Sequence, residues 1–517
     1  MGHMTNHIPH ARAIAGGLVA MTLSLLSPLH ATTLLTGSNC STAGVTTTGN
    51  AAGQVIIGCA GTGSLQVNAS NSGNALTTLN TNFGGSISLV AGFAGTGSVL
   101  VNGNGTAGSA TINSLRGIQL GGSSGTGNLT VQNGGLVQVT TNTYSITIGQ
   151  SNSTGVATVT GPGSVLTVRD RIEVGSFSGS SGSLSVLNGG LVQAIGTSDN
   201  SLFAGGSGTG EVLVSGSGSS LVTSGVALGN GAGGNGGTVT VEDGGSITVG
   251  LLGSGAGNGL SVGADSPSTI LVTGAGSSIQ VDAITAGLFA GNEINIGGFG
   301  QGALVIEDSA TVNAAGANVH VSGGVFGTST ASAGLLTVRD GGSLTAATVM
   351  VFTNGTVNGN GTIFGDVIAS GGTIAPGNSP GMLTIDGNYY QEVGSQLLIE
   401  IAGNGAGQFD VLNVLGTASF DSGASISLVF TEGFAPTANE VFDFLLAGDF
   451  DTDMSLVDIS IAGLESGFQY DVDFSDAGTF TLTALTDGIS VVPVPAAVWL
   501  FGSALGMLGW MRRRAAV

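Results

Sequence analysis

Acid–base chemistry in this chain is limited by its histidines, because His320 is the only one beyond the first 31 residues. Ser-His-Asp and Cys-His arrangements need a histidine or an equivalent general base, and no second candidate is present. His320 lies at a polar position of the alternating run Asn318–Val321. We therefore predict an exposed strand residue at this position and no catalytic set.

Two short runs combine arginine with acidic residues, at 169–173 (Arg-Asp-Arg-Ile-Glu) and at Arg339-Asp340. A polysaccharide lyase would pair such a basic residue with acid-bound Ca²⁺, and a glycosidase would need two facing carboxylates. The sequence does not place any two carboxylates face to face. Both runs lie at turns of a repeat described below, so we predict local charge pairing and no enzyme activity.

Metal binding has one candidate, the spacing of Asp449, Asp451 and Asp453, which resembles the opening of an EF-hand loop. The sixth position would be Met454 instead of Gly and the twelfth Ser460 instead of Glu, so the pattern fails. We predict no metal site and no cofactor. Weak Ca²⁺ bridging by the acidic C-terminal region stays open beside the simpler reading of a solvated acidic surface.

The elements that would position these residues are short and glycine-rich. The 517 residues include 96 Gly, 41% are hydrophobic, only 7% are charged and none is Lys. Helix formers such as Glu, Lys and Arg are scarce, which predicts an all-β protein. The net charge of −22 argues against a nucleic-acid partner, since nucleic-acid binding needs cations that replace condensed counterions.

A repeat of 55 residues organises the centre of the chain. Asn133-Gly134-Gly135 recurs at Asn188 and, as Asp-Gly-Gly, at Asp243. Each unit holds six short runs that alternate apolar with polar or small residues, as half-buried strands do. Repeats of this length indicate a stacked array. We predict a right-handed parallel β-helix (a solenoid) with two or three coils per unit, at roughly 22 residues a coil. A β-propeller is the less favoured alternative, because propeller blades show aromatic markers.

Both ends carry targeting features. Arg12, an apolar run over 13–26 and the small residue Ala31 before Thr32 predict a signal peptide cut between Ala31 and Thr32 by signal peptidase after export by the Sec translocon. An apolar stretch before the arginines at 512–514 predicts a single C-terminal transmembrane helix. Cys40 and Cys59 predict a disulfide in an exported protein, with two unpaired buried thiols as the alternative.

The last 26 residues resemble the PEP-CTERM sorting signal in its VPLPA-type variant, with Val494 where that variant usually has Leu. The residues that carry the resemblance are Val492, Pro493, Val494, Pro495, Ala496, Ala497, Trp499, Phe501, Gly502, Arg512, Arg513 and Arg514. The resemblance implies export from a Gram-negative bacterium, a transient stay in the inner membrane and recognition by an exosortase-type protease. It also implies delivery to the cell surface or an exopolysaccharide matrix.

The body resembles the repeat shared by autotransporter passenger domains and PEP-CTERM proteins. Gly-x-Leu-x-Val segments lead into Asn/Asp-Gly-Gly, as over 127–135 and 182–190. The stretch 371–381 (Gly-Gly-Thr-Ile-Ala-Pro-Gly-Asn-Ser-Pro-Gly) and the run Phe409–Val414 are similar to the end of such passenger domains. The resemblance implies a β-helix rod whose sides serve as a surface.

These observations predict five segments and one role. The segments are a signal peptide (1–31), an N-terminal cap (32–90), a repeat β-helix (91–394), an acidic C-terminal β region that caps the rod (395–486) and a linker with the sorting tail (487–517). The predicted role is that of a structural or adhesin-like protein of the cell surface or extracellular matrix. A β-helix polysaccharide lyase or hydrolase, and a carbohydrate-binding surface protein, are the alternatives.

Overall fold

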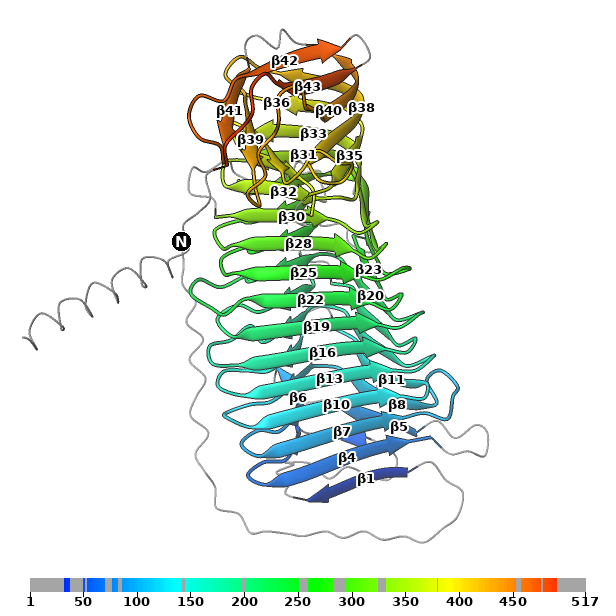
Figure 1. Cartoon of the computed structure of the whole chain (residues 1–517). Coiled ribbons are helices and arrows are strands. Elements are labelled where there is room, and N and C mark those ends of the chain that lie inside the picture. The colour runs from blue at the N-terminus through cyan, green and yellow to red at the C-terminus, as the bar shows by residue number, and fades with distance from the viewer. Residues whose placement is uncertain are drawn as a thin grey trace, which may run out of the picture.

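A computed structural model describes the chain over 32–37, 50–51, 54–69, 77–81, 86–141, 145–196, 200–250, 259–282, 293–323, 332–378, 380–451, 457–475 and 478–490. Every regular element among these residues is a β-strand, and the strands stack along one elongated rod (Figure 1). Nearly all neighbouring strands run parallel and belong to successive turns of the chain. The predicted all-β parallel solenoid is therefore confirmed.

One face of the rod is a sheet of sixteen strands. Its first strand pairs antiparallel with the second, and all later neighbours are parallel. Its members in spatial order are β1 (Thr32–Gly37), β4 (Thr62–Asn68), β7 (Thr96–Asn102), β10 (Thr126–Gln132), β13 (Thr154–Thr160), β16 (Ser181–Leu187), β19 (Thr209–Ser215), β22 (Gly237–Glu242), β25 (Ser268–Thr273), β28 (Gly302–Glu307), β30 (Gly334–Val338), β32 (Gly355–Gly359), β34 (Thr373–Pro376), β37 (Gln396–Ile401), β39 (Ser425–Phe430) and β41 (Asp458–Ala462). We call it the long-strand face.

Two narrower faces complete each coil. The first short-strand face begins with β2 (Asn50–Ala51), β5 (Thr77–Thr81), β8 (Ala110–Ser114), β11 (Gly135–Val139), β14 (Val165–Val168), β17 (Leu191–Ala194), β20 (Ser220–Thr223), β23 (Ser246–Val249) and β26 (Ser278–Val281). The second short-strand face begins with β3 (Val55–Ile57), β6 (Ile87–Ala91), β9 (Gly117–Leu120), β12 (Ile146–Ile148), β15 (Ile172–Val174), β18 (Leu202–Ala204), β21 (Val226–Leu228), β24 (Leu260–Val262) and β27 (Ile294–Ile296).

The short-strand faces merge further along the chain, where single bent strands cover both. These are β29 (Thr311–Val321), β31 (Ser343–Phe352), β33 (Thr362–Ser370), β38 (Val411–Phe420) and β40 (Val441–Phe450), with β35 (Met382–Asp386) and β36 (Tyr389–Gln391) still separate. The parallel ladder continues without a break across the predicted boundary at 394/395, through β34, β37, β39 and β41. Beyond it, β43 (Thr479–Ala484) pairs antiparallel with β40 and with β42 (Tyr470–Ser475).

The 55-residue repeat corresponds to two coils. Thr126, Thr154 and Ser181 occupy the same register position in three successive long strands, so the 55 residues from 126 to 181 make two complete turns. The predicted 22 residues per coil is too low for this region. Each coil needs three strands and also a turn such as Gly149–Ser153, which joins the second short-strand face to the next long strand.

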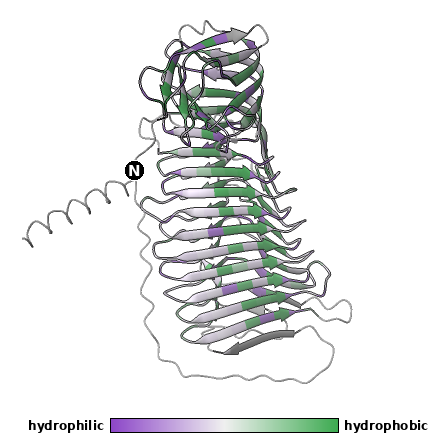
Figure 2. Ribbon diagram, viewed as in Figure 1, coloured by the Kyte–Doolittle hydropathy of each residue, from purple (hydrophilic) through white to green (hydrophobic). Residues whose placement is uncertain are grey.

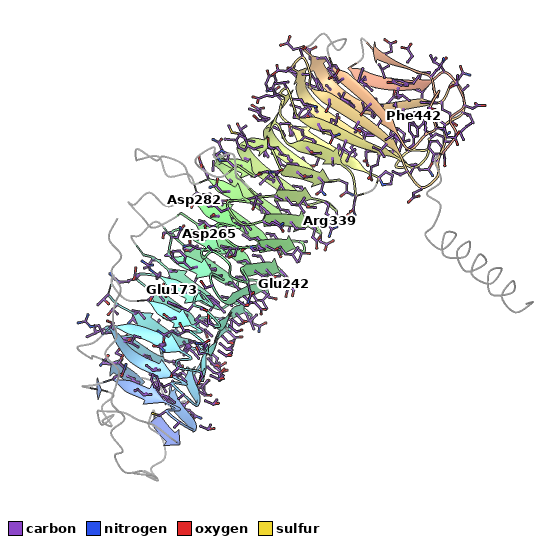
Figure 3. The ribbon with its side chains drawn as sticks, turned by 90° about the vertical axis from the view of Figure 1, so that its left-hand side faces the viewer. Glu173, Glu242, Asp265, Asp282, Arg339 and Phe442 are labelled. Carbon is purple, nitrogen blue, oxygen red and sulfur yellow. The ribbon has the colours of Figure 1, made fainter. Side chains whose placement is uncertain are left out.

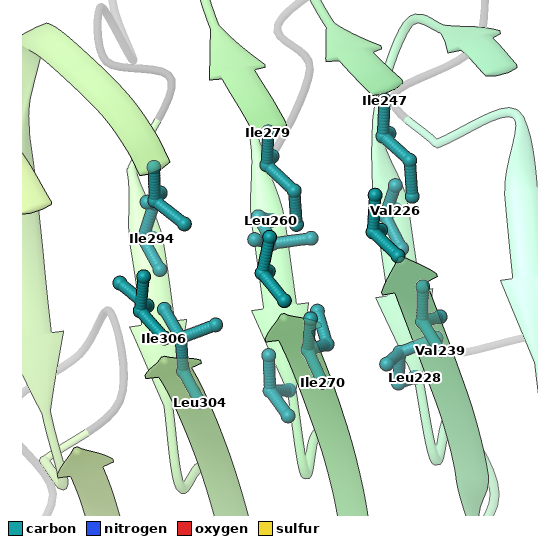
Figure 4. Packing of buried hydrophobic residues seen from close by; sticks show 14 of the residues in the cluster. Val226, Leu228, Val239, Ile247, Leu260, Ile270, Ile279, Ile294, Leu304 and Ile306 are labelled. Carbon is teal, nitrogen blue, oxygen red and sulfur yellow. The ribbon is translucent and has the colours of Figure 1, made fainter. Parts of the chain in front are cut away.

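The core is a stack of aliphatic side chains from the inward positions of all three faces. In β10 the inward residues are Leu129 and Val131, and both are at most 1% exposed. Figure 4 shows how inward residues from successive coils, such as Val239, Ile270 and Leu304, pack as layers. Figure 2 shows the alternation of hydrophobic and polar residues that produces this arrangement. Each fully buried aliphatic side chain stabilises the fold by about 1.5–3 kcal/mol.

Two kinds of turn alternate at the corner after the long strand, which explains why the repeat spans two coils. In one coil Asn188 and Gly189 both have positive φ, a conformation that Gly and Asn adopt at low cost. In the next coil the buried Ser219 accepts the N–H of Gly189 at 3.0 Å and donates to the carbonyl of Ser215 at 2.7 Å. The Asn/Asp-Gly-Gly turn of one coil and the Gly-x-Gly-Ser turn of the next coil are thus joined by a hydrogen bond.

The glycine that recurs as the second residue of several long strands, such as Gly127 in β10, has a steric origin. A Cβ at Gly127 would lie 2.2 Å from the backbone nitrogen of Gly121 and 2.3 Å from the carbonyl oxygen of Ala91. The chain of one coil therefore crosses the strand of the next at a distance that only glycine permits.

Candidate functional surface

The first Arg-acid run forms a local ion-pair cluster on the second short-strand face. The Arg171 guanidinium lies 3.9 Å from Asp170 and 3.9 Å from Glu173, and its Cζ lies 5.5 Å from the ring centre of Phe203 in the next coil. Burial raises the pKa of the Asp170 and Glu173 carboxyls, and Arg171 opposes that rise. Thr147 also donates to Glu173 at 3.3 Å. The predicted charge pairing is confirmed for this run.

The second run is also paired. Arg339 donates from Nε to Glu307 at 2.8 Å, and the same nitrogen lies 3.7 Å from Asp340. The hydrogen bond to Glu307 raises the pKa of Arg339. Figure 3 shows that Arg339 and Glu173 lie at different heights of the rod. Each Arg therefore has carboxylate partners within its own region of the surface.

His320 differs from its prediction. Its side chain is only 14% exposed, because it packs edge-on against Phe352 at 5.7 Å between ring centres and approaches Glu293 at 3.7 Å. Burial lowers the pKa of His320, and Glu293 opposes this effect. The prediction of an exposed residue is wrong, because neighbouring coils place side chains from residues 27 positions before it and 32 positions after it around the ring.

The spacing of Asp449, Asp451 and Asp453 is only partly covered by the described residues. Asp449 accepts the N–H of the adjacent Phe450 at 2.8 Å, and Asp453 lies outside the described residues. Across the described ranges, no group of three or more His, Cys, Asp or Glu side chains is arranged to hold a metal ion.

A buried carboxylate that the sequence did not single out closes the turn at 376–381. Asp410 is 2% exposed and accepts the N–H groups of Gly381 at 2.9 Å and Glu400 at 2.8 Å. Burial raises the pKa of Asp410 to about 7, the two N–H groups oppose the rise, and Glu400 adds to it. A Cβ at Gly377 would lie 2.1 Å from its Oδ1. Gly377 of the Pro-Gly-Asn-Ser-Pro-Gly turn thus makes room for this carboxylate.

The outward positions of the faces carry rows of neutral polar side chains. On the first short-strand face Asn113 donates to Asn80 at 3.0 Å, Gln138 donates to Asn113, and Thr167 donates to Gln193 at 3.2 Å. These contacts join side chains of successive coils. They give this part of the first short-strand face a row of neutral hydrogen-bonding groups.

Most of the predicted targeting residues lie outside the described ranges. These are Ala31, Cys40 and the sorting-signal residues from Val492 to Arg514. Thr32 is the first residue of β1, and Cys59 is disulfide-bonded. Among the described residues there is no helix of the length and apolarity that a membrane crossing requires.

Comparison with known proteins gives likenesses among solved structures. No protein-family model matches the chain, and no curated protein matches it. Among solved structures, a TibC-catalysed hyper-glycosylated fragment of TibA is similar at 17% identity with a TM-score of 0.31. The match covers 75% of this chain and 97% of that fragment.

Proposed function

We propose that this chain is an exported, non-enzymatic structural or adhesin-like protein of the bacterial surface or extracellular matrix. The observation that carries the proposal is a continuous rod whose outward rows are mainly neutral hydroxyl and amide groups. Neutral hydroxyl and amide groups suit a surface that must stay solvated outside the cell. The arginines that a lyase would use as bases, Arg171 and Arg339, are engaged by neighbouring carboxylates.

The two ends of the rod support a role as a free-standing element. An uncovered terminal coil would be an open sheet edge and would invite aggregation. At the N-terminal end β1 lies antiparallel on β4, and at the C-terminal end β43 lies antiparallel on β40. We propose that these strands act as caps. We also propose that the coils wind in the right-handed sense, which connections between parallel strands prefer.

The tail supplies the proposed route to the surface. The signal peptide would direct the chain to the Sec translocon, and the apolar segment with Arg512–Arg514 would hold it in the inner membrane until an exosortase-type protease acts. Mass spectrometry of the protein released from cells tests this route. We expect a mature N-terminus at Thr32 and a C-terminus near Val492.

Two variants sharpen this test. Removal of 492–517 should abolish retention at the membrane, whereas Phe93→Ala, a change on the exposed body, should leave sorting unchanged. An intact Arg512–Arg514 tail on the released protein would refute processing. Release of unsaturated or shortened oligosaccharides from a panel of polysaccharides by the purified protein would refute the non-enzymatic role.

A further inference from the structure

A column of outward residues runs along the second short-strand face across five consecutive coils. Asn295, His320, Met350, Ile368 and Tyr390 pair in register from β27 to β36. Neighbouring parallel strands lie about 4.8 Å apart, so the column extends for roughly 20 Å along the rod. We call these five residues the axial strip.

One end of the axial strip presents an aromatic ring to solvent. Tyr390 is 36% exposed, although the adjacent Tyr389 is fully buried in the core. The Tyr390 hydroxyl donates to Asp421, which fixes the side chain across the surface of the next coil. Ile368 lies beside it in register. A fixed, exposed ring next to an aliphatic side chain is a suitable platform for the apolar face of a sugar ring.

Hydrogen-bond acceptors lie beside the strip at its Tyr390 end. Glu392 accepts from Ser370 next to Tyr390, and Asp366 accepts the N–H of Asn388 at 2.8 Å. At the other end, Oδ1 of Asn295 is buried and has no hydrogen-bond partner in the described part of the chain. Asn295 is only 6% exposed, so a ligand reaches the strip from the Tyr390 end.

The negative charge of the C-terminal part of the rod narrows the choice of ligand. Residues 341–490 include 18 Asp or Glu and no Lys, Arg or His. A uronic-acid polymer or a nucleic acid would be repelled by this field, whereas an ammonium group would be attracted to it. The axial direction of the strip suits a linear polymer better than a small solute.

We propose that the axial strip binds a linear amino-sugar polysaccharide. A sugar ring lies on Tyr390, and the ammonium and hydroxyl groups donate to Glu392 and Asp421. This inference rests on the proposed function, because it names the matrix polymer that a surface rod of this kind would hold.

Binding to an immobilised β-linked glucosamine oligomer tests the proposal, with the full chain purified in mild detergent at pH 6. We expect Tyr390→Ala to weaken binding about tenfold and Tyr390→Phe to retain most of it, because the ring supplies most of the contact. Glu392→Gln should also weaken binding and reduce its salt dependence. Phe93→Ala removes a ring of similar exposure in an early coil and serves as the matched control.

Several outcomes would overturn the inference. They are the absence of binding to the glucosamine oligomer, equal binding by Tyr390→Ala and Phe93→Ala, and tighter binding to polygalacturonate than to glucosamine. Surface immunolabelling of cells that express the native chain separates the two proposals. Normal labelling with no polymer binding by the native chain refutes the strip alone, whereas absence of the native chain from the cell surface refutes the proposed function.

Discussion

Asp410 should make the stability of the rod depend on pH in an unusual direction. Most native carboxylates have lowered pKa values, and the protein then loses stability in acid. Burial instead raises the pKa of Asp410 from 3.8 to about 7. Between these two values the folded state binds a proton that the unfolded state does not, so the contribution of Asp410 falls as pH rises. It is fully present below pH 4 and lost above pH 7.

The size of the effect follows from the two pKa values. They differ by about three units, and one unit corresponds to about 1.4 kcal/mol, so the loss is on the order of 4 kcal/mol. Three other groups act over part of this range, and one of them is Asp170, whose pKa burial raises. Glu173 has a raised pKa and adds to the trend, whereas His320 has a lowered pKa and favours the folded state at higher pH.

The assay compares thermal unfolding midpoints at pH 4.5 and pH 7.5 for the native chain and for Asp410→Asn. The amide cannot titrate, so the native chain should lose more stability than the variant when pH rises. Asp410→Asn should itself be less stable at pH 4.5, because its NH₂ group faces one of the two N–H donors. Glu173→Gln and Asp170→Asn are the controls for the other carboxyls with raised pKa values. An identical pH response in the native chain and Asp410→Asn would refute the reasoning.

Three further changes test the construction of the coils. Ser219→Ala should reduce stability by about 1–3 kcal/mol by leaving the N–H of Gly189 without a partner, whereas the exposed Ser217→Ala should change the unfolding midpoint little. Leu184→Ala, at a fully buried core position, should cost about 2–5 kcal/mol in denaturant unfolding. Reduction of the disulfide at Cys59, or Cys59→Ser, should lower stability by about 3 kcal/mol and increase proteolysis near the N-terminus; unchanged protease resistance would contradict this.

The stacking of the coils was predictable because its causes are local. Alternation in runs such as 156–159 fixes which residues face the core, and the Asn-Gly-Gly turns fix where the chain bends. The number of residues per coil was harder to predict. The return turns vary from Gly121–Gly125 to the longer stretch at Gly229–Gly236, and their length has no counterpart in the strand pattern.

The partners of individual side chains were not predictable, because they depend on register between coils of unequal length. Glu293 and His320 meet only because β27 and β29 pair with Asn295 opposite His320. In the same way, Asp410 is buried by a turn that ends 29 residues earlier, at Gly381. A shift of two residues in any intervening turn would leave the strand pattern intact and change both contacts.

This dependence on register also determines where a binding surface can be found in such a rod. A solenoid places one residue per coil at each outward position, so a linear ligand contacts residues that are about 20 to 30 positions apart. Asn295, His320 and Tyr390 share no local motif, and each is unremarkable beside its sequence neighbours. Their common column appears only after the register is known. A binding surface in this chain therefore consists of residues that pair in register across coils, and no short sequence motif marks it. A substitution should weaken binding only where its residue belongs to that column or lies beside it.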